Sequence, residues 1–151
     1  MKRAQRLEMV QRVVDDLERR KAEALAASER RVSESEAKLA ELEGYRMSYV
    51  RDFTVRAGSG IDGASARDYQ VFLGRLDEAL RQQSQVVVRT RAQRDSERQN
   101  WQGAAQRAEA VGQIVKHWKN EEQRDLDRRE QLESDERSQR PPAHGLDPRG
   151  D

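Results

Sequence analysis

Gly58-Ser59-Gly60-Ile61-Asp62-Gly63 interrupts a chain whose composition is otherwise typical of long helices. Three glycines in six residues make helical order entropically costly and permit a positive φ. All tyrosines and phenylalanines of the chain lie within a few helical turns on either side of this break. They are Tyr45, Tyr49, Phe53, Tyr69 and Phe72. We therefore expect a helical hairpin with an aromatic-rich tip.

The composition excludes several classes of protein. Of the 151 residues, 38% are charged and only 34% hydrophobic, which is too polar for a globular core of the usual size. Because 29 Lys and Arg nearly cancel 28 Asp and Glu, the chain also differs from disordered proteins of high net charge. Interspersed charges of both signs are typical of coiled coils. The absence of cysteine excludes disulfides, thiolate catalysis and Cys-based zinc sites.

A heptad repeat follows the glycines and predicts a helix over about 65–139. Ser65 and Asp68 fit a capping box at its start. The expected seam positions advance in alternating steps of four and three, as in a supercoiled helix. They are Tyr69, Leu73, Leu76, Leu80, Gln83, Val87, Thr90, Arg94, Glu97, Trp101, Ala104, Ala108, Val111, Val115, Trp118, Glu122, Asp125, Arg129 and Leu132.

The segment before the glycines predicts a first helix over about 3–56. Its expected seam begins with an N-terminal stripe of Leu7, Val10, Val14 and Leu17. It continues through a second run, which is Leu25, Ser28, Val32, Ser35, Leu39, Leu42, Arg46, Tyr49 and Phe53. Because two steps of four join the stripes through Lys21, we expect a stutter there.

Folding at about Gly60, with a turn over about 57–64, pairs residue i with roughly residue 121 minus i. The polar parts of the two seams then face each other, which favours antiparallel pairing within one chain. The second helix runs past the N-terminus from about Glu121, and the proline-containing residues 140–151 are expected to be a disordered tail. The predicted fold is all-α, a long antiparallel coiled-coil hairpin forming one domain over 1–139.

No motif for phosphate or metal binding occurs, and the carboxylates lie on helical faces with no pocket to raise a pKa. We expect no enzyme activity, cofactor or metal. No apolar run approaches the roughly 20 residues that span a bilayer, so no direct membrane insertion is expected. Acidic residues interrupt the basic N-terminal region, which makes nucleic-acid binding less favoured than protein binding.

Apolar side chains near the turn exceed what two paired helices can use. Tyr45 and Phe72 lie beside the seam, with Ala79 on the same flank. An exposed aromatic and aliphatic patch of this kind marks a partner site. The alternative is that the rings fold over the seam.

The pattern Leu42-x-x-Tyr45-x-x-x-Tyr49, a Gly/Ser turn, Tyr69-Gln-x-Phe72-Leu73-x-x-Leu76-x-x-Ala79-Leu80 and a later Trp101 resembles the flagellar export protein family FliJ. The resemblance implies a component of the flagellar type III export apparatus, similar to the two-helix stalk of rotary ATPases. It implies a cytoplasmic location, peripheral to the inner membrane at the flagellar base.

The resemblance also implies partners and contact residues. The free ends of the hairpin would enter the hexameric flagellar export ATPase, in a region that contains Arg3, Arg6, Leu7, Arg124 and Arg128. The face near the turn would bind the cytoplasmic linker of the transmembrane export gate, through Leu42, Tyr45, Tyr49, Phe72, Leu76 and Ala79. Lys38 and Gln83 beside them depart from the family pattern. Export chaperones would be further partners.

Two alternatives stay open at this point. The first is the equivalent stalk of a virulence-type secretion system, which shares the coiled coil. The second is a generic homo-oligomeric scaffold, in which another chain fills the seam.

Overall fold

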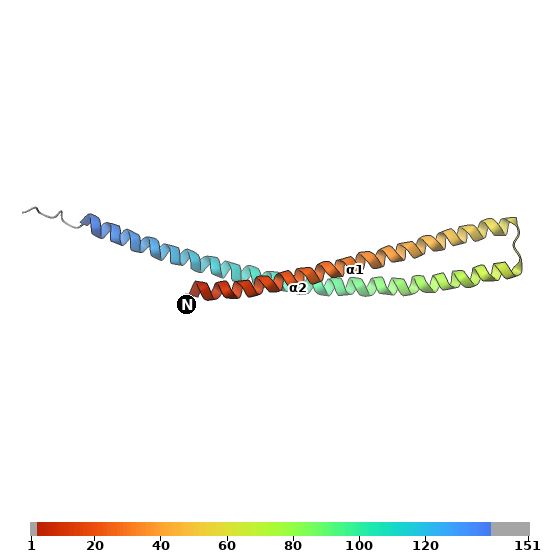
Figure 1. Ribbon diagram of the computed structural model, residues 1–151, viewed down its shortest axis with the longest axis horizontal. Helices are drawn as coiled ribbons and strands as arrows, with labels where there is room; N and C mark the ends of the chain where they lie inside the picture. Colours follow the sequence, from red (N-terminus) through yellow and green to blue (C-terminus); the bar gives the residue numbers. More distant parts are fainter. Residues whose placement is uncertain (1–2, 140–151) are drawn as a thin grey trace, which may run out of the picture. The chain divides into compact units, whose positions relative to one another are not determined.

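A computed structural model describes residues 3–139 as two helices, and this part of the chain contains no strand. Helix α1 spans Arg3–Ser59 and helix α2 spans Gly63–Gln139 (Figure 1). The expected all-α antiparallel hairpin is confirmed, although α1 ends about three residues later and α2 begins about two residues earlier than the sequence indicates. The tail expected at 140–151 lies outside the described residues.

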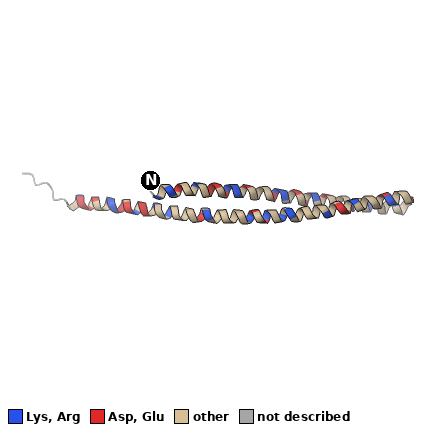
Figure 2. Cartoon of the chain, turned by 90° about the horizontal axis from the view of Figure 1, so that it is seen from below, with Lys and Arg blue, Asp and Glu red and all other residues tan. Residues whose placement is uncertain are grey.

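The chain divides into two compact units, which are described separately here. One unit comprises residues 15–106, and the other combines residues 1–14 with 107–151. In each unit a segment of α1 runs antiparallel to a segment of α2 (Figures 1 and 2). Side chains of the two helices contact each other along a seam. A single domain over 1–139 stays a prediction.

The turn consists of Gly60, Ile61 and Asp62, and its geometry explains the glycine. Gly60 has a φ of 93°, in the left-handed region that an L side chain rarely adopts, and its N–H donates to the Ala57 carbonyl at 3.3 Å. At the start of α2, Asp62 is the N-cap residue. Its Oδ1 accepts from the Ser65 N–H at 2.7 Å, and its carbonyl accepts from the Ala66 N–H at 3.0 Å.

The capping box predicted at Ser65 and Asp68 is therefore wrong. Asp62 takes the N-cap position three residues earlier, because α2 begins at Gly63, directly after Asp62. From there its short carboxylate reaches the Ser65 N–H, one of the N–H groups of the first turn that have no partner within the helix. Ser65 supplies a capped N–H instead. The hydrogen bond that Asp62 accepts from Ser65 holds the pKa of the Asp62 carboxyl below its usual value of 3.8.

The heptad seam predicted for α2 is confirmed as far as Glu122. Every expected position from Tyr69 to Glu122 is buried or half-buried, whereas Asp125, Arg129 and Leu132 are exposed. The most deeply buried of these positions are Leu76, Val87, Ala104 and Val115. All residues from 123 to 139 are exposed, so the part of α2 without a partner helix begins close to the expected Glu121.

The register between the helices is also close to the prediction. Tyr49 packs on Phe72, Ser35 contacts Thr90, and in the other unit Gln11 Nε2 lies 3.6 Å from the position that a Cβ on Gly112 would take. The residue numbers in these pairs add to between 121 and 125, against the expected 121. The turn at Gly60 is therefore sufficient to fix which residues meet within each unit.

One detail of the α1 seam was wrong. Val10 is 47% exposed, and Gln11 occupies the seam position instead. A path in alternating steps of three and four is buried or half-buried, and it comprises Ala4, Leu7, Gln11, Val14, Glu18, Lys21 and Leu25. Leu17 is half-buried as well, so the stutter expected around Lys21 stays a prediction. A search for apolar residues misses this path because Gln11 and Glu18 are polar.

Glu18 is accepted at the seam because it has a partner on α2. The indole Nε1–H of Trp101 donates to the Glu18 carboxylate at 2.8 Å, which compensates for the partial loss of hydration. Within residues 3–139, neither helix has a stretch long and apolar enough to cross a membrane.

Candidate functional site

Four aromatic rings form a cluster next to the turn. Tyr49 lies at the centre, with ring centroids 4.4 Å from Phe72 and 4.9 Å from Tyr69, and Phe53 contacts Tyr69 at 5.1 Å. Tilted pairs at these distances each contribute about 0.5–1.5 kcal/mol beyond their buried area. The helical spacing brings the rings together, because Tyr49 and Phe53 are four residues apart on α1 and Tyr69 and Phe72 are three residues apart on α2.

A groove runs beside this cluster, on one flank of the two helices. It is lined by Tyr45, Ser48, Tyr49, Asp52, Phe72 and Leu76. Leu76 is buried and Tyr49 half-buried, whereas the rings of Tyr45 and Phe72 remain 55% and 42% exposed. An apolar floor with two exposed aromatic walls is a surface that can bury a partner's apolar side chains.

The rim of this aromatic groove carries hydrogen-bond acceptors. The Tyr69 hydroxyl donates to Asp52 Oδ2 at 2.8 Å, and that hydrogen bond is the main reason that the pKa of Tyr69 lies above its usual value of 10.0. The Tyr45 hydroxyl donates to Glu41 at 3.2 Å, and Arg56 lies 3.6 Å from Asp52. Carboxylates at the edge favour a partner segment that combines apolar side chains with N–H or cationic donors.

The aromatic groove contains four of the six residues predicted to bind the export gate, Tyr45, Tyr49, Phe72 and Leu76. Leu42 and Ala79 are half-buried and do not line it. Ser48 and Asp52 do line it, and sequence reasoning missed both. Ser48 follows Tyr45 by three residues and Asp52 follows Tyr49 by three, and this spacing could have identified them, since such residues share one helical face.

The structure also explains the two residues that depart from the family pattern. Gln83 points into the seam, where its Nε2–H donates to the Ser35 carbonyl at 3.0 Å. Lys38 lies on the surface, with its ammonium 3.6 Å from Glu41. The alternative that the rings beside the seam fold over it holds in part for Phe72, whose ring packs on Tyr49 although Phe72 is 42% exposed, but not for the exposed Tyr45.

In a comparison with protein-family models, residues 1–145 match the flagellar FliJ protein. The chain belongs to the flagellar FliJ protein family. FliJ proteins are non-enzymatic components of the flagellar export apparatus. Comparisons with curated proteins and with solved structures gave no match.

The residues that the FliJ resemblance implies for ATPase binding fall into two groups in the other unit. On α1, Arg3 stacks its guanidinium 4.4 Å from the centre of the Trp118 ring, and Leu7 is half-buried. Arg6 is exposed. On α2, Arg124 and Arg128 belong to the segment whose residues are all exposed, where they pair with Glu121 and Asp125 of the same helix at 3.2 Å.

One further contact ties the N-terminal turns of α1 to α2. The Lys119 ammonium lies 2.7 Å from the Glu8 carboxylate, and this hydrogen bond and charge hold the pKa of Glu8 below 4.5. The residue numbers of this pair add to 127, so sequence reasoning with an expected sum of 121 missed it. The cation–π contact of Arg3 with Trp118 was also missed, although its residue numbers add to 121 and the predicted register could have identified it.

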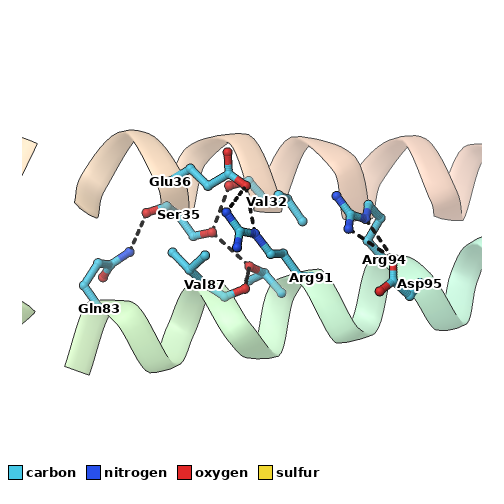
Figure 3. A network of polar contacts seen from close by, with 9 residues as sticks. Val32, Ser35, Glu36, Gln83, Val87, Arg91, Arg94 and Asp95 are labelled. Carbon is cyan, nitrogen blue, oxygen red and sulfur yellow. Dashed lines mark hydrogen bonds and ion pairs between the residues drawn. The ribbon is translucent and has the colours of Figure 1, made fainter. Parts of the chain in front are cut away.

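A polar network crosses the seam farther from the turn (Figure 3). Ser35 and Thr90 contact each other at 2.9 Å, and Arg91 binds Glu36 at 3.1 Å. No described buried side chain leaves a polar atom without a hydrogen-bond partner. The network therefore links the two helices and has no unpaired buried group that could bind a ligand. Residues 3–139 contain no cluster of His, Asp and Glu suited to a metal ion.

Proposed function

We propose that this chain is a stalk that couples the hexameric flagellar export ATPase to the transmembrane export gate. The aromatic groove binds the cytoplasmic linker of the gate, and the unit that contains the N-terminal turns binds the ATPase. In this proposal the protein works in the cytoplasm at the flagellar base. Export chaperones are further partners, for which no contact residues are proposed.

The single observation that carries the gate proposal is the exposure of Tyr45 and Phe72 beside a well-packed aromatic cluster. Two paired helices have no third layer to cover these rings, although Tyr49 and Leu76 next to them are held in place. A rigid apolar surface of this kind loses little side-chain entropy on binding. The gate linker fits as an occupant if it supplies apolar side chains between the Tyr45 and Phe72 rings.

The ATPase proposal is supported by the other unit. Arg6 is exposed there, and the exposed part of α2 presents Arg124 and Arg128 along one helical face, four residues apart. A helix with mixed charges and no partner is only marginally stable in water, so a protein ring around it would order it. The match to a flagellar family favours this reading over a virulence-type stalk.

The test is a binding assay with purified export ATPase and the soluble gate domain with its linker, using a Tyr45→Ala/Phe72→Ala variant. We expect gate binding to fall at least tenfold and ATPase binding to stay unchanged, because the two surfaces belong to different units. The matched control is Met47→Ala/Val88→Ala, which removes two apolar side chains that are more exposed and lie outside the groove. Unchanged gate binding of the Tyr45→Ala/Phe72→Ala variant would contradict the proposal that the aromatic groove binds the gate linker.

A further inference from the structure

The unit formed by residues 3–14 and 107–139 leaves an apolar patch uncovered. Met9, Val10, Val13 and Ile114 are between 46% and 68% exposed. The seam does not need them, since it is already filled by Ala4, Leu7, Gln11, Val14 and Val115. We call these four exposed residues the N-terminal patch.

The same unit has a second uncovered surface, on the part of α2 that lacks a partner helix. Leu126 and Leu132 are 50% and 63% exposed in a segment whose residues are all exposed. Leu126 lines a shallow hollow with Glu122, Asp125 and Arg129. These four residues share one face because they are three, four and seven residues apart. We call residues 123–139 the α2 extension.

The two surfaces carry opposite charge. Residues 3–14 and 107–119 contain six Lys and Arg against two Glu, a net charge of +4, whereas residues 120–139 contain eight Asp and Glu against four Arg, a net charge of −4. Arg6 lies four residues before Val10, and Arg107 seven before Ile114, so both border the N-terminal patch. Neither forms an ion pair within the described residues.

We propose that two copies of this chain associate through these surfaces, with the α2 extension of each copy docked on the N-terminal patch of the other. Leu126 and Leu132 cover the exposed valines and Ile114, and the carboxylates of the extension face Arg6 and Arg107. The arrangement is isologous, so it closes after two copies. The chain's own extension cannot make this contact, because α2 continues as one helix from Gly63 to Gln139.

The absence of cysteine allows a direct test by disulfide cross-linking. Gln11 of α1 lies against Gly112, so Val13 is close to this part of α2. Leu126 lies fourteen residues further along the helix, or about 20 Å. A disulfide requires Cα atoms within about 7 Å, so a bond between positions 13 and 126 must join two chains. Mixing Val13→Cys with Leu126→Cys protein under mild oxidation should give a cross-linked dimer.

The matched control replaces Leu126→Cys by Val88→Cys, a more exposed position in the other unit, so lower accessibility cannot account for weaker cross-linking. We expect at least tenfold less cross-linked product from Val13→Cys with Val88→Cys. Equal cross-linking in the two mixtures, or a monomer mass at every concentration in sedimentation, would overturn the proposal. A monomer that binds the ATPase through the same surfaces would be one such outcome.

A charge exchange tests the specific contacts. Arg6→Glu/Arg107→Glu and Asp125→Arg/Glu133→Arg should each be monomeric alone, because like charges then face each other. An equimolar mixture should restore the dimer, since both contacts of the mixed pair are again of opposite sign. Added salt should weaken the wild-type dimer. A mixture that stays monomeric while the wild type dimerises would overturn the assignment of these charges.

Self-association does not depend on the proposed function and is measured without either partner. If the ATPase also binds this unit, the two interactions compete, and this consequence alone rests on the proposed function.

Discussion

The hydroxyl oxygens of Ser35 on α1 and Thr90 on α2 lie 2.9 Å apart across the seam. Each hydroxyl also lies within hydrogen-bonding distance of a carbonyl of its own helix, that of Val32 at 2.9 Å and that of Val87 at 3.0 Å. Two hydroxyl hydrogens therefore serve three contacts, and one hydrogen is shared. The small polar residues here allow close packing of the helices rather than a large apolar contact.

Replacing a small buried residue of the seam by a larger one should destabilise the hairpin. Ser28 is only 1% exposed, and its hydroxyl donates to the Leu25 carbonyl at 2.7 Å. We expect Ser28→Leu to lower the free energy of unfolding by about 1–3 kcal/mol, because the added atoms push the helices apart. Urea unfolding followed by circular dichroism measures this change. Ser33→Leu, at an exposed position of the same helix, should change stability by less than about 0.5 kcal/mol.

The cap at the start of α2 should depend on Asp62 and not on Asp68. Asp62→Ala removes the acceptor of the Ser65 N–H, so we expect a lower melting temperature and faster amide exchange at Ser65. Asp62→Asn keeps a side-chain oxygen and should retain most of the protection. If Asp68→Ala has the larger effect on Ser65 exchange, the assignment of the cap is wrong.

Tyr45 and Tyr49 should differ in what their loss affects. Tyr49→Ala removes two ring contacts and should cost about 1–3 kcal/mol of stability, below the range for fully buried aromatic residues, because Tyr49 is half-buried. Gate binding should fall with it. Tyr45→Ala should weaken gate binding alone and leave the melting temperature unchanged. Equal loss of stability in both variants would contradict this division.

The Glu8 carboxyl should titrate below its usual pKa of 4.5, and Lys119 should be the main cause. Because the folded-state pKa is lowered, the pair stabilises its unit above pH 4.5, and this stabilisation is lost as the pH falls through the folded-state pKa. NMR titration of Glu8 should therefore give a pKa that rises toward 4.5 in Lys119→Met. A pKa that Lys119→Met leaves unchanged would assign the shift to another charge.

The sequence was sufficient for the features that repeat along the chain. The steps of three and four from Tyr69 to Glu122 identify the seam of α2, and the glycines fix the register, because both depend on local spacing. The exposure of Tyr45 and Phe72 follows from the same spacing, since both residues fall beside the seam.

Features that depend on a partner across the seam could not be read in this way. Glu18 looks like a surface residue until Trp101 is placed opposite, and Gln11 is polar but fills the space beside Gly112. Val10 was predicted to be at the seam on hydrophobicity alone, and the register leaves it outside. The N-cap was misplaced because Asp62 and Ser65 both suit that position, and only the exit of the chain from Gly60 decides between them.

The three-residue turn also implies an order of events during folding. Tyr69 and Asp52 are only 17 residues apart, whereas Ser35 and Thr90 are separated by 55, and Trp101 and Glu18 by 83. Closing a short loop costs less chain entropy than closing a long one. We therefore expect the aromatic pairs next to the turn to form first, because each pair that forms shortens the loop left for the next. Glu8 and Lys119 are farther apart still, so we expect the N-terminal residues to pair last and to separate first when the helices part.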